Sequence, residues 1–274
     1  MTNIKIGTSG YSIPDWKGTA YPAKIKESEM FDWYVNQFRF NMVEMNYTYY
    51  RQPSARVFET LVNKSPDDFT FTVKLFGGLT HDAFKDYLPN SLDYQMCDEF
   101  VEGIKPLTES GKLGCILAQF PASLLCSPEA WGYLLSLPDA LDNLPIVYEF
   151  RNKGWVSAET FSILHGSRIG FCAVDEPKLG ALMPLVPEVT SDVGYMRLHG
   201  RSKLWFKDKN LRYDYLYSEA ELKRFIPLIK SMASKSKTMF VALNNCHAGS
   251  AVQNVKMLKM LMNMDDEPMQ GELF

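Results

Sequence analysis

The sequence predicts an α/β fold, specifically a single TIM-type (β/α)8 barrel with a parallel eight-stranded core. Eight short apolar or β-branched segments recur along the 274 residues, and helix-like stretches lie between most of them. No low-complexity tract or linker interrupts this alternation, so we expect residues 1–274 to form one domain. About eight strand–helix units within ~250 residues is the size of a (β/α)8 barrel. A doubly wound open sheet is the alternative architecture.

The expected strands are short, apolar or β-branched, and bounded by Gly, Pro, Asn or Asp. They span residues 3–8, 40–46, 69–75, 113–119, 145–150, 168–174, 193–199 and 238–244.

The expected helices follow these strands and show amphipathic spacing or a recognisable start. Ser127-Pro128-Glu129 supplies an N-cap, a first-turn proline and an early acid, and Ser218 with Glu221 forms a capping box. The other helical stretches span residues 27–38, 54–64, 92–108, 157–166 and 250–262. The segment after the sixth strand is rich in proline, and we expect it to be irregular.

The composition narrows the class of protein. No run approaches the ~18 consecutive apolar residues of a membrane span, and the N-terminus has no signal-peptide pattern, so we expect a cytoplasmic protein with no membrane partner. Five cysteines without a Cys-x-x-Cys pair favour neither a disulfide framework nor a zinc ribbon. The net charge of -3 lacks the global basic signature of a nonspecific nucleic-acid binder, so any affinity for anions is local.

Polar side chains end three of the expected strands in pairs two residues apart. Residues i and i+2 of a strand point to the same face. Burying polar or charged side chains costs free energy unless they form hydrogen bonds or ion pairs, or bind a ligand. In a barrel of this type the carboxyl ends of the strands and the loops after them carry the functional residues. The pairs are Glu44 with Asn46, Glu149 with Arg151, and Arg197 with His199. They therefore predict a site at this end of the barrel.

Five cationic residues near the strand ends predict an anion-binding site. They are Arg51, Lys74, Arg151, Arg197 and Arg201. A guanidinium group matches phosphate or carboxylate with two hydrogen bonds, and an ammonium group adds a point charge. The alternative is purely structural ion pairing with Glu44, Glu149 and Asp175.

Acids and histidines at the same end are candidates for proton transfer. We expect His199 to transfer the proton, because imidazole titrates near neutrality, and Glu149 to orient it. Glu44 is a further acid at a strand end, and His81, in a glycine-rich loop, is a second catalytic candidate.

A metal centre is an alternative use of these residues. Glu149, Asp175 and His199 would supply oxygen and nitrogen ligands for Mn, Mg or Zn, an arrangement that resembles the metal sites of sugar isomerase barrels. Those sites commonly take a further acid from the last strand, where this chain has Asn244. Because Arg151 and Arg197 would crowd a divalent cation with positive charge, we predict neither a metal nor another cofactor and keep a divalent metal as the alternative.

The seventh loop, Gly200–Tyr217, interleaves basic and aromatic residues. They are Arg201, Lys203, Lys207, Lys209 and Arg212 among Trp205, Phe206, Tyr213, Tyr215 and Tyr217. Such a pattern can follow a phosphate backbone and stack on bases. Two acids dilute the charge, so we favour aromatics that pack on the barrel and keep nucleic acid as a less favoured partner.

Motifs distributed along the chain resemble the YecE-like family, a domain-of-unknown-function family with a TIM-type barrel. They are Ile6-Gly7-Thr8-Ser9-Gly10-Tyr11, Asp15-Trp16-Lys17-Gly18, Tyr21-Pro22, Val43-Glu44-Met45-Asn46 continuing to Arg51, Phe71-Thr72-Val73-Lys74, Thr80-His81, Gln119-Phe120-Pro121, Glu149-Phe150-Arg151 with Trp155, Arg197-Leu198-His199-Gly200-Arg201 and Asn244-Asn245. The resemblance covers nearly the whole chain and implies the barrel but no established reaction. Two positions depart from the family pattern: Asn152 replaces a usual His, and Tyr11 a usual Trp.

These observations predict an enzyme that acts on an anionic, phosphorylated small molecule by acid/base chemistry at the barrel rim. Amides at Asn46, Gln119 and Asn244 would orient the substrate. Aromatic walls would come from Trp16, Tyr50 and Trp155. The first alternative is a metal-dependent barrel that isomerises sugars or cleaves phosphodiesters. The second is a non-catalytic protein that binds a ligand or nucleic acid at the same mouth.

Overall fold

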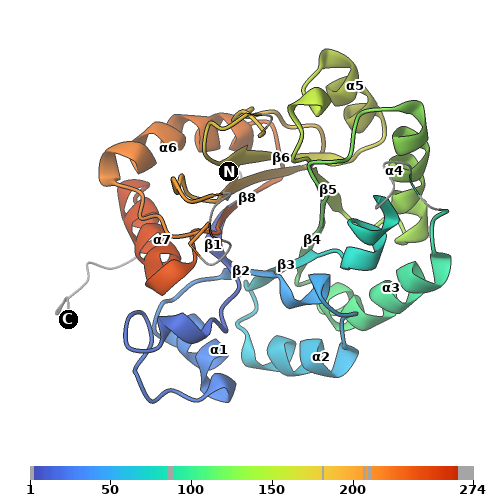
Figure 1. Ribbon diagram of the computed structural model, residues 1–274. Helices are drawn as coiled ribbons and strands as arrows, with labels where there is room; N and C mark the ends of the chain where they lie inside the picture. The colour runs from blue at the N-terminus through green and yellow to red at the C-terminus, as the bar shows by residue number, and fades with distance from the viewer. Residues whose placement is uncertain are drawn as a thin grey trace.

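The computed structural model is a closed barrel of eight parallel strands surrounded by helices (Figure 1). It describes residues 3–84, 89, 91–180, 182–205, 208 and 211–264. Each strand pairs with its sequence neighbours, and β1 closes the ring on β8. The fold class predicted from the sequence is therefore confirmed.

The eight strands begin and end within two residues of their predicted positions. They are β1 (Asn3–Ser9), β2 (Met42–Met45), β3 (Thr70–Lys74), β4 (Leu113–Gln119), β5 (Ile146–Glu149), β6 (Gly170–Asp175), β7 (Val193–Leu198) and β8 (Thr238–Leu243). Most of their residues are buried, because the inner face lines the barrel and the outer face lies under helices.

Seven α-helices lie in the described part of the chain. They are α1 (Glu27–Asn36), α2 (Ala55–Lys64), α3 (Tyr94–Glu109), α4 (Pro128–Ala140), α5 (Ala158–Gly166), α6 (Glu219–Ala233) and α7 (Ser250–Leu261). Ser127 caps α4 by accepting a hydrogen bond from the N–H of Ala130, and Ser218 and Glu221 form the predicted capping box of α6. The described residues between β6 and β7 contain no helix, as the proline-rich sequence indicated.

The helical layer follows the chain around the barrel in sequence order. Figure 1 shows α1 and α2 in blue below the strands, and α6 and α7 in orange and red beside β8 and β1. α7 packs on β1 and β8, so the last helix covers the seam where the barrel closes. None of the helices in the described ranges has both the length and the apolar character needed to cross a bilayer.

The strands place alternate side chains inside the barrel. Glu44 of β2 and Arg197 of β7 meet there although 153 residues separate them in sequence. Side chains two residues further along each strand lie closer to the carboxyl end. We call this end of the barrel its mouth.

Candidate functional site

Five charged side chains form one connected network inside the mouth. We call Glu44, Glu149, Arg151, Glu176 and Arg197 the charged cluster. Arg197 binds Glu44 with two hydrogen bonds, Nε to Oε2 at 2.9 Å and Nη2 to Oε1 at 2.6 Å. Its Nη1 reaches Oε2 of Glu149 at 2.6 Å, so one guanidinium group joins β2 to β5. A fork with two parallel hydrogen bonds fixes both side chains in position.

Arg151 extends the charged cluster toward the sixth strand. Its Nη1 donates to Oε2 of Glu176 at 2.7 Å, and its Nε lies 2.5 Å from Oε1 of Glu149 without the alignment of a hydrogen bond. The other oxygen of Glu176 accepts the N–H of Met183 at 2.8 Å. Both arginines are thus shared between two carboxylates.

Glu149 and Arg197, at the centre of the charged cluster, are buried and ionised. Burial by itself would raise the pKa of Glu149, but Arg151, Arg197 and His199 outweigh it and hold that pKa well below its usual range. The two nearby carboxylates likewise outweigh burial and raise the pKa of Arg197. Glu149 is therefore a carboxylate that positions its neighbours and has no proton to donate at neutral pH.

His199 lies beside the charged cluster and is fully buried. Nη2 of Arg151 lies 3.1 Å from its Nε2, and the carboxamide nitrogen of Asn244 lies 2.8 Å from its Nδ1. Burial, followed by the positive charge of Arg151, lowers the pKa of His199 to about 3. The ring is neutral at ordinary pH, which differs from the expectation of a histidine that titrates near neutrality.

The tautomer of His199 follows from its neighbours. A guanidinium group only donates, so the neutral ring accepts at Nε2 and carries its proton on Nδ1. Asn244 accepts that proton through its carboxamide oxygen when the amide group is flipped, because the oxygen and nitrogen of the amide occupy equivalent positions. Oε1 of Glu149 lies 3.3 Å from Nε2 and would accept a proton placed there. His199 and Glu149 therefore lie close together, and Arg151 contacts both side chains.

Asp175 and Arg201 form a separate pair outside the charged cluster. Arg201 donates from Nη2 to Oδ1 of Asp175 at 2.6 Å and from Nε to Oδ2 at 2.9 Å. Tyr217 also donates to Oδ2 at 2.7 Å, and Arg201 lies over the ring of Phe225 in α6. These contacts turn Asp175 toward the helical layer, so the pair joins β6 to the seventh loop and α6.

The structure does not assemble the metal-binding set considered for Glu149, Asp175 and His199. Asp175 faces Arg201 and Tyr217, while Glu149 faces two guanidinium groups. Within the described ranges, no three His, Cys, Asp or Glu side chains gather as ligands of one ion. The geometry of these donors does not fit a divalent cation.

Lys74 differs from Arg151, Arg197 and Arg201 because it has no carboxylate partner within the described residues. It ends β3 and is half-buried. Its Nζ donates to Oε1 of Gln119, at the end of β4, at 2.9 Å, and lies 4.4 Å from the centre of the Tyr49 ring. The hydroxyl of Thr48 also bonds the carbonyl of Lys74 and fixes its backbone.

His81 contacts the same tyrosine ring as Lys74. The two rings of Tyr49 and His81 meet edge to face with centroids 4.9 Å apart. Nδ1 of His81 lies 3.2 Å from the hydroxyl of Thr80, and in the described part of the chain neither Nε2 of His81 nor Nε2 of Gln119 has a hydrogen-bond partner. We call Lys74, Gln119 and His81 the donor group.

The electrostatics of the donor group follow from burial and from the charged cluster. Burial, followed by the charge of Arg197, lowers the pKa of Lys74 to about 7, although Glu149 and Glu44 act in the opposite direction. Burial, followed by the charge of Lys74, lowers the pKa of His81 to about 4. Lys74 is thus the group at the mouth that changes its charge near neutrality.

The predicted aromatic walls and Arg51 differ in how far they are buried. Trp16 and Trp155 are fully buried and donate hydrogen bonds to the carbonyls of Cys246 and Leu124, respectively. The two indoles therefore fix the loops after β8 and β4 and do not line an open wall. Tyr50 is 80% exposed, and the guanidinium group of Arg51 lies 5.1 Å from the ring centre of Tyr47.

The amides at the strand ends form a less charged part of the mouth. Asn46 and Asn244 are half-buried, as is Gln119. Oδ1 of Asn46 is buried with no hydrogen-bond partner among the described residues, as is the hydroxyl of Ser9. The amide oxygen of Asn46 can accept a hydrogen bond after β2, and the hydroxyl of Ser9 can donate or accept one at the end of β1.

The described part of the seventh loop packs over His199. The rings of Trp205 and Tyr213 each have centroids 6.3 Å from the imidazole, and Arg212 lies over Trp205. Trp205 is buried. Phe206, Lys207 and Lys209, which belonged to the predicted basic pattern, lie outside the described residues.

Besides Tyr49, three contributors to the site were not predicted: Tyr195, Thr72 and Glu176. Tyr195 donates to Oε2 of Glu44 at 2.8 Å, and its hydroxyl lies 2.8 Å from that of Thr72. Glu176 completes the charged cluster. The signal was available for Tyr195 and Thr72, because each lies two residues before a predicted site residue on the same strand face, Arg197 and Lys74 respectively.

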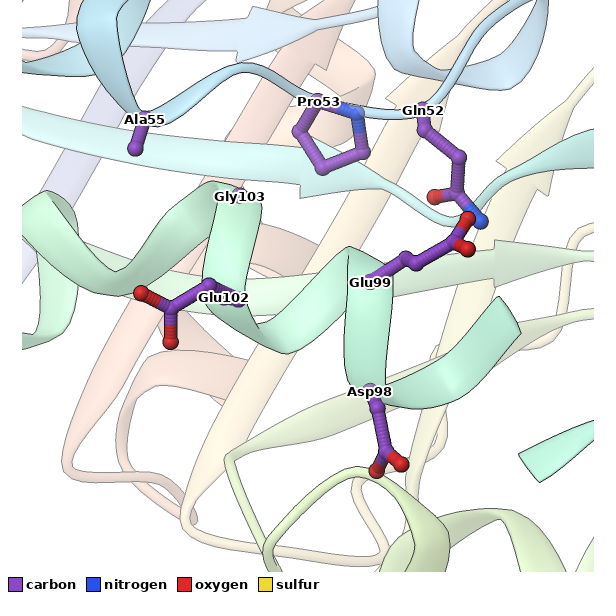
Figure 2. A pocket seen from close by; sticks show the side chains of 7 residues that line it. All are labelled: Gln52, Pro53, Ala55, Asp98, Glu99, Glu102 and Gly103. Atoms are coloured by element: carbon purple, nitrogen blue, oxygen red, sulfur yellow. The ribbon is translucent and has the colours of Figure 1, made fainter. Parts of the chain in front are cut away.

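A surface groove of about 560 Å³ lies away from the mouth, between α3 and the segment that starts α2 (Figure 2). Gln52, Pro53 and Ala55 line one side, and α3 lines the other with three carboxylates, Asp98, Glu99 and Glu102. Figure 2 shows these carboxylates on the outer helical layer. None of the predicted site residues lines this groove.

Proteins of the same family share the full length of the chain. UPF0759 protein YunF from Bacillus subtilis is 29% identical over 287 residues, covering 99% of this chain and all of the relative. The crystal structure of a DUF72 family protein from Thermotoga maritima is similar with a TM-score of 0.88 and 39% identity, covering 95% of this chain and 99% of that one. A DUF72 family protein from Enterococcus faecalis shows the same fold at 24% identity, with a TM-score of 0.82 over 98% of this chain and all of the other.

The family model described as protein of unknown function DUF72 matches residues 5–272. The match confirms, at the level of this family, the membership that the motifs led us to expect. The chain belongs to the DUF72 family.

Proposed function

We propose that this protein is an enzyme that binds a small anionic molecule at the barrel mouth and transfers protons there. One observation carries the proposal: Lys74 is a half-buried cation at the mouth with an amide and an aromatic ring, and no carboxylate within the described residues, as its neighbours. An ammonium group in this position lacks a counter-ion, which an anionic ligand would supply.

The neighbours of Lys74 suit the same ligand. Gln119 accepts from Lys74 through its oxygen, which leaves its amide nitrogen to donate to a ligand. His81 offers its Nε2, and the charges of Arg151 and Arg197 reach this position, as their lowering effect on the pKa of Lys74 indicates. Of the four arginines in the anion hypothesis, Arg151, Arg197 and Arg201 bind carboxylates of the protein itself. Arg151 and Arg197 would therefore act on the ligand through their electrostatic field.

Proton transfer at this site would use the donor group. Lys74 exchanges a proton near pH 7, and an anion beside His81 would raise the low pKa of that imidazole toward neutrality. The charged cluster beneath would remain fixed and orient the groups above it. The amides of Asn46 and Asn244 would bind uncharged polar parts of the substrate.

Sulfate is a suitable probe for the anion-binding part, because its charge is constant between pH 6 and pH 8.5. We expect a saturable increase in melting temperature at pH 6, where Lys74 is protonated, and a weaker one at pH 8.5. Chloride at matched ionic strength controls for general salt effects. Lys74→Gln should abolish the saturable part, whereas equal and unsaturable responses of both proteins would contradict the proposal.

Catalysis is tested separately from binding. Anionic metabolites that stabilise the protein would be incubated with it and followed by NMR for chemical conversion. Conversion that is lost in His81→Gln while stabilisation persists would support proton transfer by the donor group. Binding without conversion of any ligand would favour the alternative of a non-catalytic binding protein.

A further inference from the structure

We infer that Lys74 is a nucleophile whose amine forms an imine with the carbonyl group of an aldehyde or ketone substrate. The inference rests on the proposed function, because it uses the same side chain, and it names a substrate class: a small carbonyl compound that carries an anionic group. The position of Lys74, its partners and the charges around it each bear on the inference.

The position of Lys74 allows attack on a substrate. The side chain ends β3 inside the barrel, is half-buried and reaches the mouth. Its ammonium group contacts the Gln119 oxygen at 2.9 Å and the Tyr49 ring at 4.4 Å, neither of which carries a negative charge. Lys112 shows the contrast with a structural lysine. It is directed away from the mouth, and its ammonium group donates hydrogen bonds to three oxygens of Val62 and Ser65.

The surroundings maintain a fraction of free amine. Burial, Arg197 and Arg151 disfavour the ammonium form, while Glu149 and Glu44 partly offset them. At pH 7 roughly half of the Lys74 side chains would be unprotonated, against on the order of one in a few thousand for a lysine with an ordinary pKa. Lysines activated in this way are those that form Schiff bases.

The reaction balances without an external oxidant or reductant. The amine lone pair attacks the carbonyl carbon, the C–N bond forms, and the carbonyl electron pair moves to oxygen, which takes a proton. The nitrogen loses a proton, the hydroxyl group leaves as water after a second protonation, and the C=N bond forms. His81, whose imidazole senses the charge of Lys74 and contacts the same Tyr49 ring, is the group that we propose exchanges these protons.

An anionic group on the substrate would favour the product. The iminium nitrogen carries a positive charge, as the ammonium did; burial, Arg197 and Arg151 disfavour that charge, and Glu149 and Glu44 offset them only in part. A negative charge on the substrate would supply the remaining compensation. An anionic group next to the carbonyl of the substrate would lie beside this iminium and near Gln119 and His81. A carbonyl compound with an adjacent carboxylate therefore combines both recognition elements.

Trapping with cyanoborohydride tests the inference. The wild-type protein would be incubated at pH 7 with glyoxylate, which has an aldehyde next to a carboxylate, or with uncharged glycolaldehyde, and labelled lysines identified by peptide mass spectrometry. We expect glyoxylate to label Lys74 at least ten-fold more than Lys64 and Lys223, two exposed lysines in the same sample. Labelling of Lys74 should fall below pH 7 with a midpoint near that value.

Lys74→Arg separates the two proposals, because arginine keeps the positive charge but cannot form an imine. This variant should retain saturable sulfate binding, and glyoxylate should no longer label position 74. Equal labelling of Lys74 and the exposed lysines by both probes would overturn the nucleophile, even if sulfate binds. Strong labelling of Lys74 by both probes in a protein that does not bind sulfate would support the nucleophile and contradict the anionic substrate.

Discussion

At the scale of the residue, the buried imidazole of His199 couples stability to pH. Its pKa of about 3 in the folded protein lies below the value of about 6.5 expected in the unfolded chain. Above pH 6.5 both states are neutral at this residue and nothing is lost. As the pH falls from 6.5 toward 3, the unfolded state takes up the proton first, so the folded state loses stability.

We expect His199→Gln to flatten this dependence. The wild-type free energy of unfolding should decrease by up to about 1.4 kcal/mol per pH unit below pH 6.5 through this residue alone, and the variant should lack that contribution. Urea denaturation between pH 4.5 and 8 measures it. His165, exposed at the end of α5, is the matched control, and His165→Gln should keep the wild-type slope. Parallel curves for wild type and His199→Gln would show that His199 is not held neutral.

Arg197 is the residue whose loss should cost the most. Arg197→Met leaves Glu44 and Glu149 buried without their shared cation, so we expect a loss of about 3–5 kcal/mol at pH 7. Without Arg197 the pKa of Glu149 should rise, which reduces the loss at pH 5 because a neutral carboxyl group is less costly to bury. Denaturation of both proteins at the two pH values tests this. Arg224→Met on the exposed face of α6 should change stability by less than about 0.5 kcal/mol.

At the scale of the element, helix starts provide a matched pair. Ser127 caps α4 with a hydrogen bond from the N–H of Ala130, whereas Ser54 occupies the same position before α2 without a capping bond from its side chain. Ser127→Ala should therefore cost about 1 kcal/mol, and Ser54→Ala much less. Thermal and urea unfolding of the two variants gives the comparison. A larger loss in Ser54→Ala would mean that these caps do not determine the stability of the helices.

The elements themselves were largely predictable because their signals are local. Ser127-Pro128-Glu129 and the Ser218–Glu221 box mark helix starts within a few residues, and the strands are short apolar runs between turn residues. The Glu149–Arg151 and Arg197–His199 pairs also pointed to the mouth, because a strand repeats its face every second residue.

The partners of these side chains were less predictable, and β6 shows why. All six of its residues are buried, so its sequence carries no alternation that separates the inner face from the outer one. Asp175 was expected at the site and faces Arg201, while Glu176, one residue later, joins the charged cluster. Likewise, the sequence does not state which of the five cations have a carboxylate partner, since the answer depends on contacts between strands far apart along the chain.

At the scale of the whole molecule, the two halves of the barrel depend on each other. Glu44 receives its hydrogen bonds from Tyr195 and Arg197, and β1 pairs with β8, so the first half contains a buried acid whose partners belong to the second. We expect a fragment of residues 1–141 to lack a cooperative thermal transition when alone. Mixing it with residues 142–274 should restore one, as circular dichroism would show. A cooperative transition of the isolated first fragment would contradict this dependence.

The bond between Glu44 and Arg197 also orders events during synthesis. The two residues are 153 positions apart, so a ribosome adds Arg197 roughly 8 to 30 seconds after Glu44. During this interval the Glu44 carboxylate lacks its Arg197 partner and remains hydrated, because burying an unpaired carboxylate is costly. The Glu44 carboxylate of β2 can therefore be buried inside the barrel only after β7, which carries Arg197, has been synthesised.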